Sequence, residues 1–196
     1  MKVSQLSGSL RSNVGKKDAK ATRDAGMVPC VLYGQGTQTH FAVKDIAIEK
    51  LVFNPDVFQI ELDIEGTKAT AIIQELQQNP VTDKVTHVDF LQLDPKKPVK
   101  VALPVRLVGS SRGVMAGGKL LQVFRRLKVV ALPGDLPEAI IVDISKLRIG
   151  QSIRVGDLET EAKGVKFIDA KSAVVVSVKM ARGASKAAEA DDEDED

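Results

Sequence analysis

Apolar and polar side chains alternate with a period of two in several segments of this chain, and this pattern constrains the fold more than any other feature. In 59–65, three apolar residues alternate with four polar ones. Because successive side chains of a strand point to opposite faces, such a segment covers a core on one face and meets water on the other. Gly66 and Thr67 follow and lead into a second such run at 68–74, which predicts a β-hairpin.

The same analysis predicts a mainly β protein with short helices. Other strands predicted in the first half cover 3–10, 28–33 and 41–43. One predicted helix is capped by Asp18 and ends at Gly26, and another is capped by Asp45 and ends near Leu51. The prediction is therefore a mainly β first domain with short helices, followed by further β structure.

A domain boundary is expected at 93–98, where two prolines and two lysines interrupt every periodic pattern. Beyond it, 99–107 alternates strictly, with Pro104 tolerable only on an edge strand or at a bulge. Further strands are predicted at 120–131, 139–144, 151–155 and 173–180. The predicted organisation is a first domain over 1–92, a linker over 93–98, a second β-rich domain over 99–182 and a tail over 183–196.

The formal net charge of +2 conceals an acidic tail. Residues 183–196 contain seven acids and one lysine, so the tail carries −6 and the rest of the chain +8. We expect this tail to be disordered, and a basic body favours a polyanionic partner. The densest positive stretch precedes residue 30, where six lysines and arginines face two aspartates.

Several functional classes are excluded by what the chain lacks. No apolar run approaches the roughly 20 residues of a membrane helix, and no apolar signal segment follows Met1, so we expect a cytoplasmic protein without a membrane partner. The single cysteine, Cys30, excludes an internal disulfide framework and a multi-cysteine zinc site.

Neither nucleotide binding nor catalysis is favoured. Residues 113–119 have the spacing of a phosphate-binding loop, but Leu120 stands where a hydroxyl should bind magnesium, so we expect a flexible glycine loop. Cys30 lies among small hydrophobic residues, where an inert thiol is expected. His40 and His87 have no convergent carboxylates for a metal site. We therefore predict a protein that is not an enzyme and holds no cofactor or metal.

RNA binding is the leading hypothesis from the residues themselves. A strand is predicted over 77–90, with Val88 and Phe90 on one face and His87 and Asp89 on the other. Arg11, Lys16, Lys17, Lys20 and Arg23 could neutralise phosphates, while Tyr33, Gln77, His87 and Asp89 could contact exposed bases and sugars. Alternatives remain open: Tyr33 could merely cap the core, and His87 could merely pair with Asp89.

Blocks of sequence spread along the chain resemble a known family. The first-domain blocks include Gly15-Lys16, Gly26-Met27-Val28-Pro29, Gln77-Gln78-Asn79-Pro80 and His87-Val88-Asp89-Phe90. Later blocks include Gly117-Gly118, Val142-Asp143-Ile144-Ser145 and Ile149-Gly150-Gln151. In this order they resemble bacterial large-subunit ribosomal protein twenty-five in its long form, related to the general stress protein Ctc.

The resemblance implies an N-terminal β-barrel that binds 5S ribosomal RNA in the large ribosomal subunit, and a second β-rich domain found in long members. Carried over residue by residue, its RNA contacts fall on Arg11, Lys16, Lys20, Tyr33, Gln77, His87 and Asp89. Lys17 and Arg23 are further candidates.

One departure from the family pattern concerns Ala19-Lys20-Ala21, where the family often has a serine followed by two arginines. Lysine lacks the bidentate fork of arginine, so weaker local affinity is expected. The partners of the second domain, neighbouring ribosomal proteins among them, stay open. So does the alternative of a β-domain interaction protein that acts off the ribosome.

Overall fold

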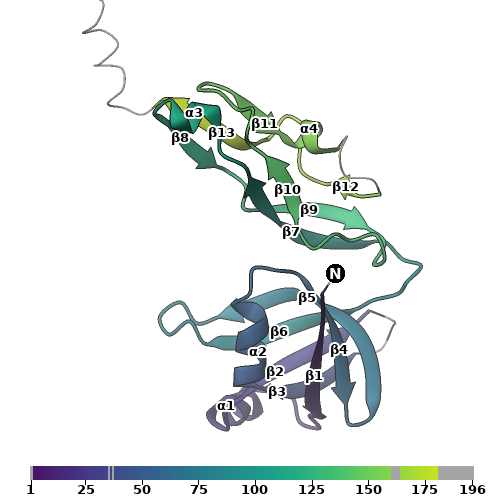
Figure 1. Ribbon diagram of the computed structural model, residues 1–196. Coiled ribbons are helices and arrows are strands. Elements are labelled where there is room, and N and C mark those ends of the chain that lie inside the picture. Colours follow the sequence, from purple (N-terminus) through teal and green to yellow (C-terminus); the bar gives the residue numbers. More distant parts are fainter. Residues whose placement is uncertain (1, 35, 37, 160–163, 181–196) are drawn as a thin grey trace, which may run out of the picture. The chain divides into compact units, whose positions relative to one another are not determined.

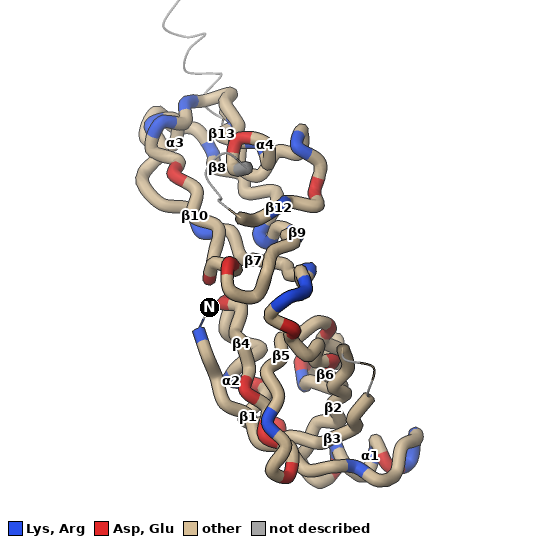
Figure 2. The backbone as a smooth tube through the Cα atoms, turned by 90° about the vertical axis from the view of Figure 1, so that its right-hand side faces the viewer, with Lys and Arg blue, Asp and Glu red and all other residues tan. Residues whose placement is uncertain are grey.

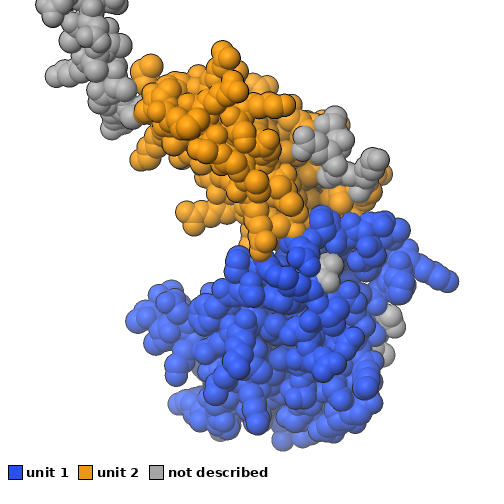
Figure 3. Space-filling view, in the orientation of Figure 1, with its two compact units in different colours: residues 1–101, 132–138 blue, residues 102–131, 139–196 orange. Residues whose placement is uncertain are grey.

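The computed structural model describes residues 2–34, 36, 38–159 and 164–180. The chain divides into two compact units, one made of residues 1–101 and 132–138 and the other of residues 102–131 and 139–196 (Figure 3). The tail at 183–196, for which disorder is expected, lies outside the described residues.

The first unit is built on a closed β-barrel, as predicted (Figure 1). Its strands are β1 (Lys2–Leu10), β2 (Met27–Tyr33), β3 (Thr39–Lys44), β4 (Phe58–Ile64), β5 (Thr67–Gln78) and β6 (Val85–Gln92). They follow one another around the barrel in the order β1-β3-β2-β6-β5-β4. The barrel closes where β4 pairs with β1 in parallel, with Leu62 opposite Leu6.

Alternation along the strands supplies the barrel core. In β4 the side chains of Ile60, Leu62 and Ile64 are buried, while the acids between them are exposed. Phe41 from β3 and Phe90 from β6 meet in the interior with ring centroids 5.6 Å apart. The strands therefore enclose a common apolar core, and the side chains between the buried ones face away from it.

Both predicted helices of the first unit are present, but their predicted caps are wrong. The helix α1 (Lys16–Asp24) has Gly15 at its N-cap, and α2 (Asp45–Val52) has Lys44 there. Asp18 and Asp45 lie in the first helical turn, where a carboxylate interacts favourably with the helix dipole without capping it.

The predicted single strand over 77–90 is also wrong, because a turn interrupts it between the end of β5 and the start of β6. The Asn79 side-chain oxygen Oδ1 accepts the backbone N–H of Val81 at 2.9 Å, and the Asn79 carbonyl accepts that of Asp83 at 2.9 Å. The alternation predicted at 87–90 is confirmed, since Val88 and Phe90 are buried and His87 and Asp89 are only partly so.

The predicted second β-rich domain is confirmed as well. Its strands are β7 (Val99–Val108), β8 (Gly118–Gln122), β9 (Arg126–Ala131), β10 (Ile140–Asp143), β11 (Ser152–Arg154), β12 (Lys166–Phe167) and β13 (Val174–Met180). Short helices α3 (Arg112–Met115) and α4 (Val155–Glu159) join them. One sheet has the strand order β10-β7-β9-β12 and the other has the order β11-β13-β8.

Three details of the second unit differ from the predictions. The predicted strand over 120–131 is split into β8 and β9, which belong to different sheets; the N–H of Val123 bonds to the Val175 carbonyl at 2.9 Å where the chain changes sheets. Pro104 is expected on an edge strand or at a bulge, but it lies in β7, which has a neighbouring strand on each side. The pairing of β7 with β10 begins at Val105, after Pro104. The strand predicted over 151–155 ends at Arg154, because α4 begins at the next residue.

The expected flexible glycine loop at 113–119 is instead tightly packed. A Cβ atom on Gly113 would lie 2.7 Å from the backbone carbon of Arg148, and one on Gly118 would lie 2.6 Å from the Gly113 carbonyl oxygen. These glycines therefore allow α3 and β8 to approach neighbouring backbone. Within the described ranges, no helix is long and apolar enough to cross a membrane.

Candidate nucleic-acid interface

Polar side chains gather on the outer face of three neighbouring barrel strands, β5, β6 and β2. Gln77 of β5 is the register partner of His87 of β6, and Glu75 is the partner of Asp89. Residues paired across strands share a face, and the inward neighbours of His87 and Asp89 are fully buried, so these four side chains point outward together.

Tyr33 belongs to the same outer face. It lies two residues beyond Val31, the β2 partner of Asp89, and Leu32 between them is buried. Burial raises the pKa of the Tyr33 hydroxyl, and the charges of Asp89 and Glu75 raise it further. The hydroxyl therefore stays protonated at neutral pH and can donate a hydrogen bond. We call Tyr33, Glu75, Gln77, His87 and Asp89 the polar face.

His87 and Asp89 contact each other within the polar face. The His87 Nδ1 and Asp89 Oδ1 atoms are 2.8 Å apart, and the two side chains are 26% and 28% exposed. The carboxylate fixes the orientation of the imidazole, whose Nε2 is then directed to other partners. The pairing expected as an alternative therefore exists, but it leaves both side chains accessible.

Exposed cations of α1 adjoin the polar face. Lys16, Lys17, Lys20 and Arg23 are all exposed on this helix, and Figure 2 shows blue segments along it. The Arg23 Nε atom donates a 3.0 Å hydrogen bond to the carbonyl of Thr86, the residue before His87. This contact joins the end of α1 to β6, so Arg23 borders the polar face and the three lysines lie on the same helix.

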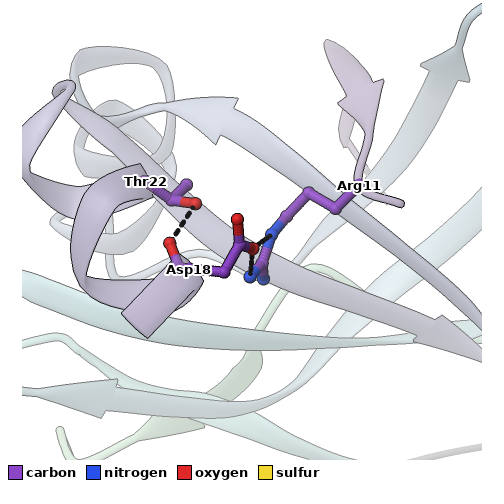
Figure 4. A network of polar contacts seen from close by, with 3 residues as sticks. All are labelled: Arg11, Asp18 and Thr22. Carbon is purple, nitrogen blue, oxygen red and sulfur yellow. Dashed lines mark hydrogen bonds and ion pairs between the residues drawn. The ribbon is translucent and has the colours of Figure 1, made fainter. Parts of the chain in front are cut away.

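Arg11 differs from the other predicted cations because a carboxylate holds its guanidinium (Figure 4). Its Nε donates to Asp18 Oδ2 at 3.2 Å, its Nη2 bonds to the same oxygen, and only 11% of the side chain is exposed. The Asp18 carbonyl in turn accepts the Thr22 hydroxyl at 2.9 Å. Arg11 therefore links the end of β1 to α1 and is poorly placed to meet phosphate.

Sequence analysis missed the parts of the interface that depend on register. A bulge between Ile73 and Glu75 is what brings Glu75 opposite Asp89, and no local pattern marks it. Thr86 was also missed; its hydroxyl donates to the Gln77 carbonyl at 3.0 Å while its own carbonyl holds Arg23. The contacts of Thr86 span β5, β6 and α1, so they emerge only from the tertiary fold.

Cys30 lies in the barrel core, away from this interface. Its side chain is buried, and burial raises the pKa of the thiol far above its ordinary value, which keeps it protonated and unreactive. Among the residues that the structure describes, no three histidine, cysteine, aspartate or glutamate side chains form a group suited to a metal ion.

Comparison with known proteins covers both units. A family model described as the Ribosomal L25p family matches residues 6–90, and one described as Ribosomal protein TL5, C-terminal domain, matches residues 98–182. A Porphyromonas gingivalis relative named large ribosomal subunit protein bL25 is 45% identical over 190 residues, covering 96% of this chain and 98% of the relative. A relative of the same name from Phocaeicola vulgatus is 42% identical over 195 residues, covering 96% and 98%.

Proposed function

The chain belongs to the bacterial large-subunit ribosomal protein bL25 family, in its long form with a TL5-type C-terminal domain, and from this we propose that it binds 5S ribosomal RNA as a structural constituent of the large subunit. The family consists of ribosomal proteins and not of enzymes. A constituent of a bacterial ribosome works in the cytoplasm, and we propose that location for this protein.

The observation that carries the proposal is the contact between α1 and β6, which brings exposed cations to the border of the polar face. Lysine and arginine neutralise phosphates without regard to sequence, whereas contacts to base and sugar edges supply specificity. The barrel thus has both kinds of group side by side, as recognition of a folded RNA requires.

The groups of the polar face have complementary roles in this proposal. The Asp89 carboxylate can only accept, so it suits a ribose 2′-hydroxyl or a base amino group. The Tyr33 hydroxyl can donate to an acceptor, whereas His87, whose Nδ1 donates to Asp89, presents Nε2 to a donor, and either ring can stack on an exposed base. Gln77 can do both with its amide.

The cations divide into two groups in the same proposal. Lys16, Lys17, Lys20 and Arg23 contact phosphates directly, while Arg11 acts through Asp18 by holding α1 in place. This assignment retains every predicted residue but gives Arg11 a positioning role.

Tyr33 provides a direct test, because it is the single tyrosine of the chain and there is no tryptophan. Titration of the protein with 5S ribosomal RNA should change tyrosine fluorescence in a saturable manner, after correction for absorption by the RNA. An unrelated structured RNA of equal length is the control. If 5S RNA binds tightly by filter retention while the Tyr33 signal does not change, the polar face is not the contact site.

A further inference from the structure

The positive charge of this chain is concentrated in its second half, outside the proposed 5S interface. Residues 1–98 contain twelve lysines and arginines and twelve acids, and are therefore neutral overall. Residues 99–180 contain fourteen lysines and arginines and seven acids, a net charge of +7. A basic excess of this size in a separate unit calls for a polyanionic partner of its own.

Part of this charge lies on the solvent face of the sheet β10-β7-β9-β12. In β9, Leu127 and Val129 are buried while Arg126 and Lys128 are exposed. Lys166 of β12 is the register partner of Val130, which shares the face of Arg126 and Lys128 because side chains two apart point the same way. We call Arg126, Lys128 and Lys166 the basic sheet face, and Figure 2 shows blue segments near the label β9.

One carboxylate beside this face is engaged with its backbone. The Asp169 Oδ2 atom accepts the backbone N–H of Lys128 at 2.9 Å. Within the described part of the chain, none of the three side chains of the basic sheet face forms an ion pair.

We propose that the basic sheet face is a second RNA-binding surface, which contacts the phosphates of a double-helical RNA segment. Arg126 and Lys128 lie two residues apart on one strand, about 7 Å along it, and Lys166 lies on the neighbouring strand opposite Val130, two residues beyond Lys128. This array of cations carries no aromatic platform and suits a regular backbone rather than unstacked bases. The proposal rests on ribosomal membership of the chain, but it concerns a surface separate from the polar face.

The test uses the full chain and the triple variant R126A/K128A/K166A. The matched control is K119A/K146A/K179A, which removes the same charge from three exposed lysines of the second unit outside this face. The probe is a synthetic RNA duplex without 5S sequence, and binding is followed by fluorescence anisotropy over a series of salt concentrations. Circular dichroism melting tests whether each variant is folded. If an alanine variant does not fold, glutamine replacements at the same three positions are used instead.

The basic-sheet-face variant should bind the duplex more weakly and lower the salt slope by about 2.1 to 2.7, at about 0.7 to 0.9 for each of three phosphates that are no longer neutralised. The control should retain most of the affinity and slope. Equal losses in both variants would reduce the effect to overall charge, and unchanged binding in both would mean that the face is merely solvated; either result overturns the proposal.

A parallel titration with 5S ribosomal RNA separates this proposal from the proposed function. If the full chain fails to bind 5S RNA while the duplex result holds, the 5S assignment fails and the basic sheet face stands. If the variant binds the duplex normally but no longer sediments with large subunits, the face contacts a protein, and the second RNA surface is refuted.

Discussion

At the scale of single residues, variants of the His87–Asp89 pair can distinguish the proposed role in RNA binding from a role in stability. Both side chains are partly exposed and lie on the strand face opposite the core. We expect His87→Ala and Asp89→Ala to leave the melting temperature nearly unchanged. Each should weaken 5S binding by roughly 1 to 3 kcal/mol, because a desolvated polar partner on the RNA is left unpaired.

Two measurements check this prediction for His87 and Asp89. A double-mutant cycle of RNA affinity should show coupling between them, since one orients the other. The losses should be similar at low and high salt, because edge contacts release few counterions. A loss of melting temperature large enough to explain the weaker binding would instead make the pair structural.

Tyr33 offers a second prediction, which concerns pH. Burial raises the pKa of its hydroxyl most, and the Asp89 and Glu75 charges add to the effect. Asp89→Asn should therefore lower the pKa of Tyr33 toward its ordinary value without reaching it, because burial remains. Ultraviolet titration of the phenolate measures this shift without interference, since the chain has a single tyrosine. Asp63→Asn, on β4, is the control and should leave the titration unchanged.

Sequence analysis succeeded at residues whose role follows from their immediate neighbours. The outward direction of His87 and Asp89 follows from the two-residue period, and the burial of Cys30 follows from the hydrophobic run around it. The engagement of Arg11 could not be predicted, because no pattern in the sequence places the Asp18 carboxylate of α1 beside it.

At the scale of elements, the salt dependence of RNA binding should distinguish Lys20 of α1 from Arg11, which holds the helix. Lys20→Ala should lower the salt slope of 5S binding by about 0.7 to 0.9, because the alanine variant leaves one phosphate at the interface without its cation. Arg11→Ala should change the slope less but lower thermal stability, because it detaches β1 from α1. Lys50→Ala, on α2, is the control for Lys20. If Arg11→Ala lowered the salt slope as much as Lys20→Ala, Arg11 would instead contact phosphate directly.

The packed glycine of α3 leads to a prediction about the second unit. Gly113→Ala should destabilise the protein by about 1 to 3 kcal/mol, because its Cβ would meet backbone atoms of Arg148 and Ile149 at 2.7 Å. Gly134→Ala is a matched control, since a Cβ there has open space around it. Urea unfolding of both variants measures the difference. Equal stability of the two variants would show that the loop is as flexible as its composition suggests.

Elements were predictable where local alternation decides them and not where distant contacts do. The barrel strands follow the period-two pattern, and β4 and β5 follow the hairpin signal at Gly66. The break between β8 and β9 contains no glycine or proline that would mark it in the sequence. It is set by backbone hydrogen bonds to Val175, some fifty residues later. The helix caps were missed because aspartate is favourable both at the cap and in the first turn.

At the scale of the whole molecule, we propose that the barrel works as an independent RNA-binding domain. All six barrel strands end by Gln92, and every residue assigned to the 5S interface lies before that point. A fragment of residues 1–98 should therefore fold and bind 5S RNA with nearly the affinity of the full chain. Gel-shift titration compares the two, with residues 99–196 as the control. A folded fragment without affinity would show that the second unit completes the 5S site.

The closure of the barrel has a consequence for how the protein is made. β1 pairs with β4 over seven register positions, from Lys2 with Phe58 to Gly8 with Ile64, so these partners are 56 residues apart. At synthesis rates of about 5 to 20 residues per second, β1 waits roughly 3 to 11 seconds for this neighbour. An unpaired strand is an aggregation hazard, but β1 buries only Leu6 in the finished barrel and is otherwise largely polar. The polar composition of β1 thus limits aggregation of the nascent chain until β4 has been synthesised.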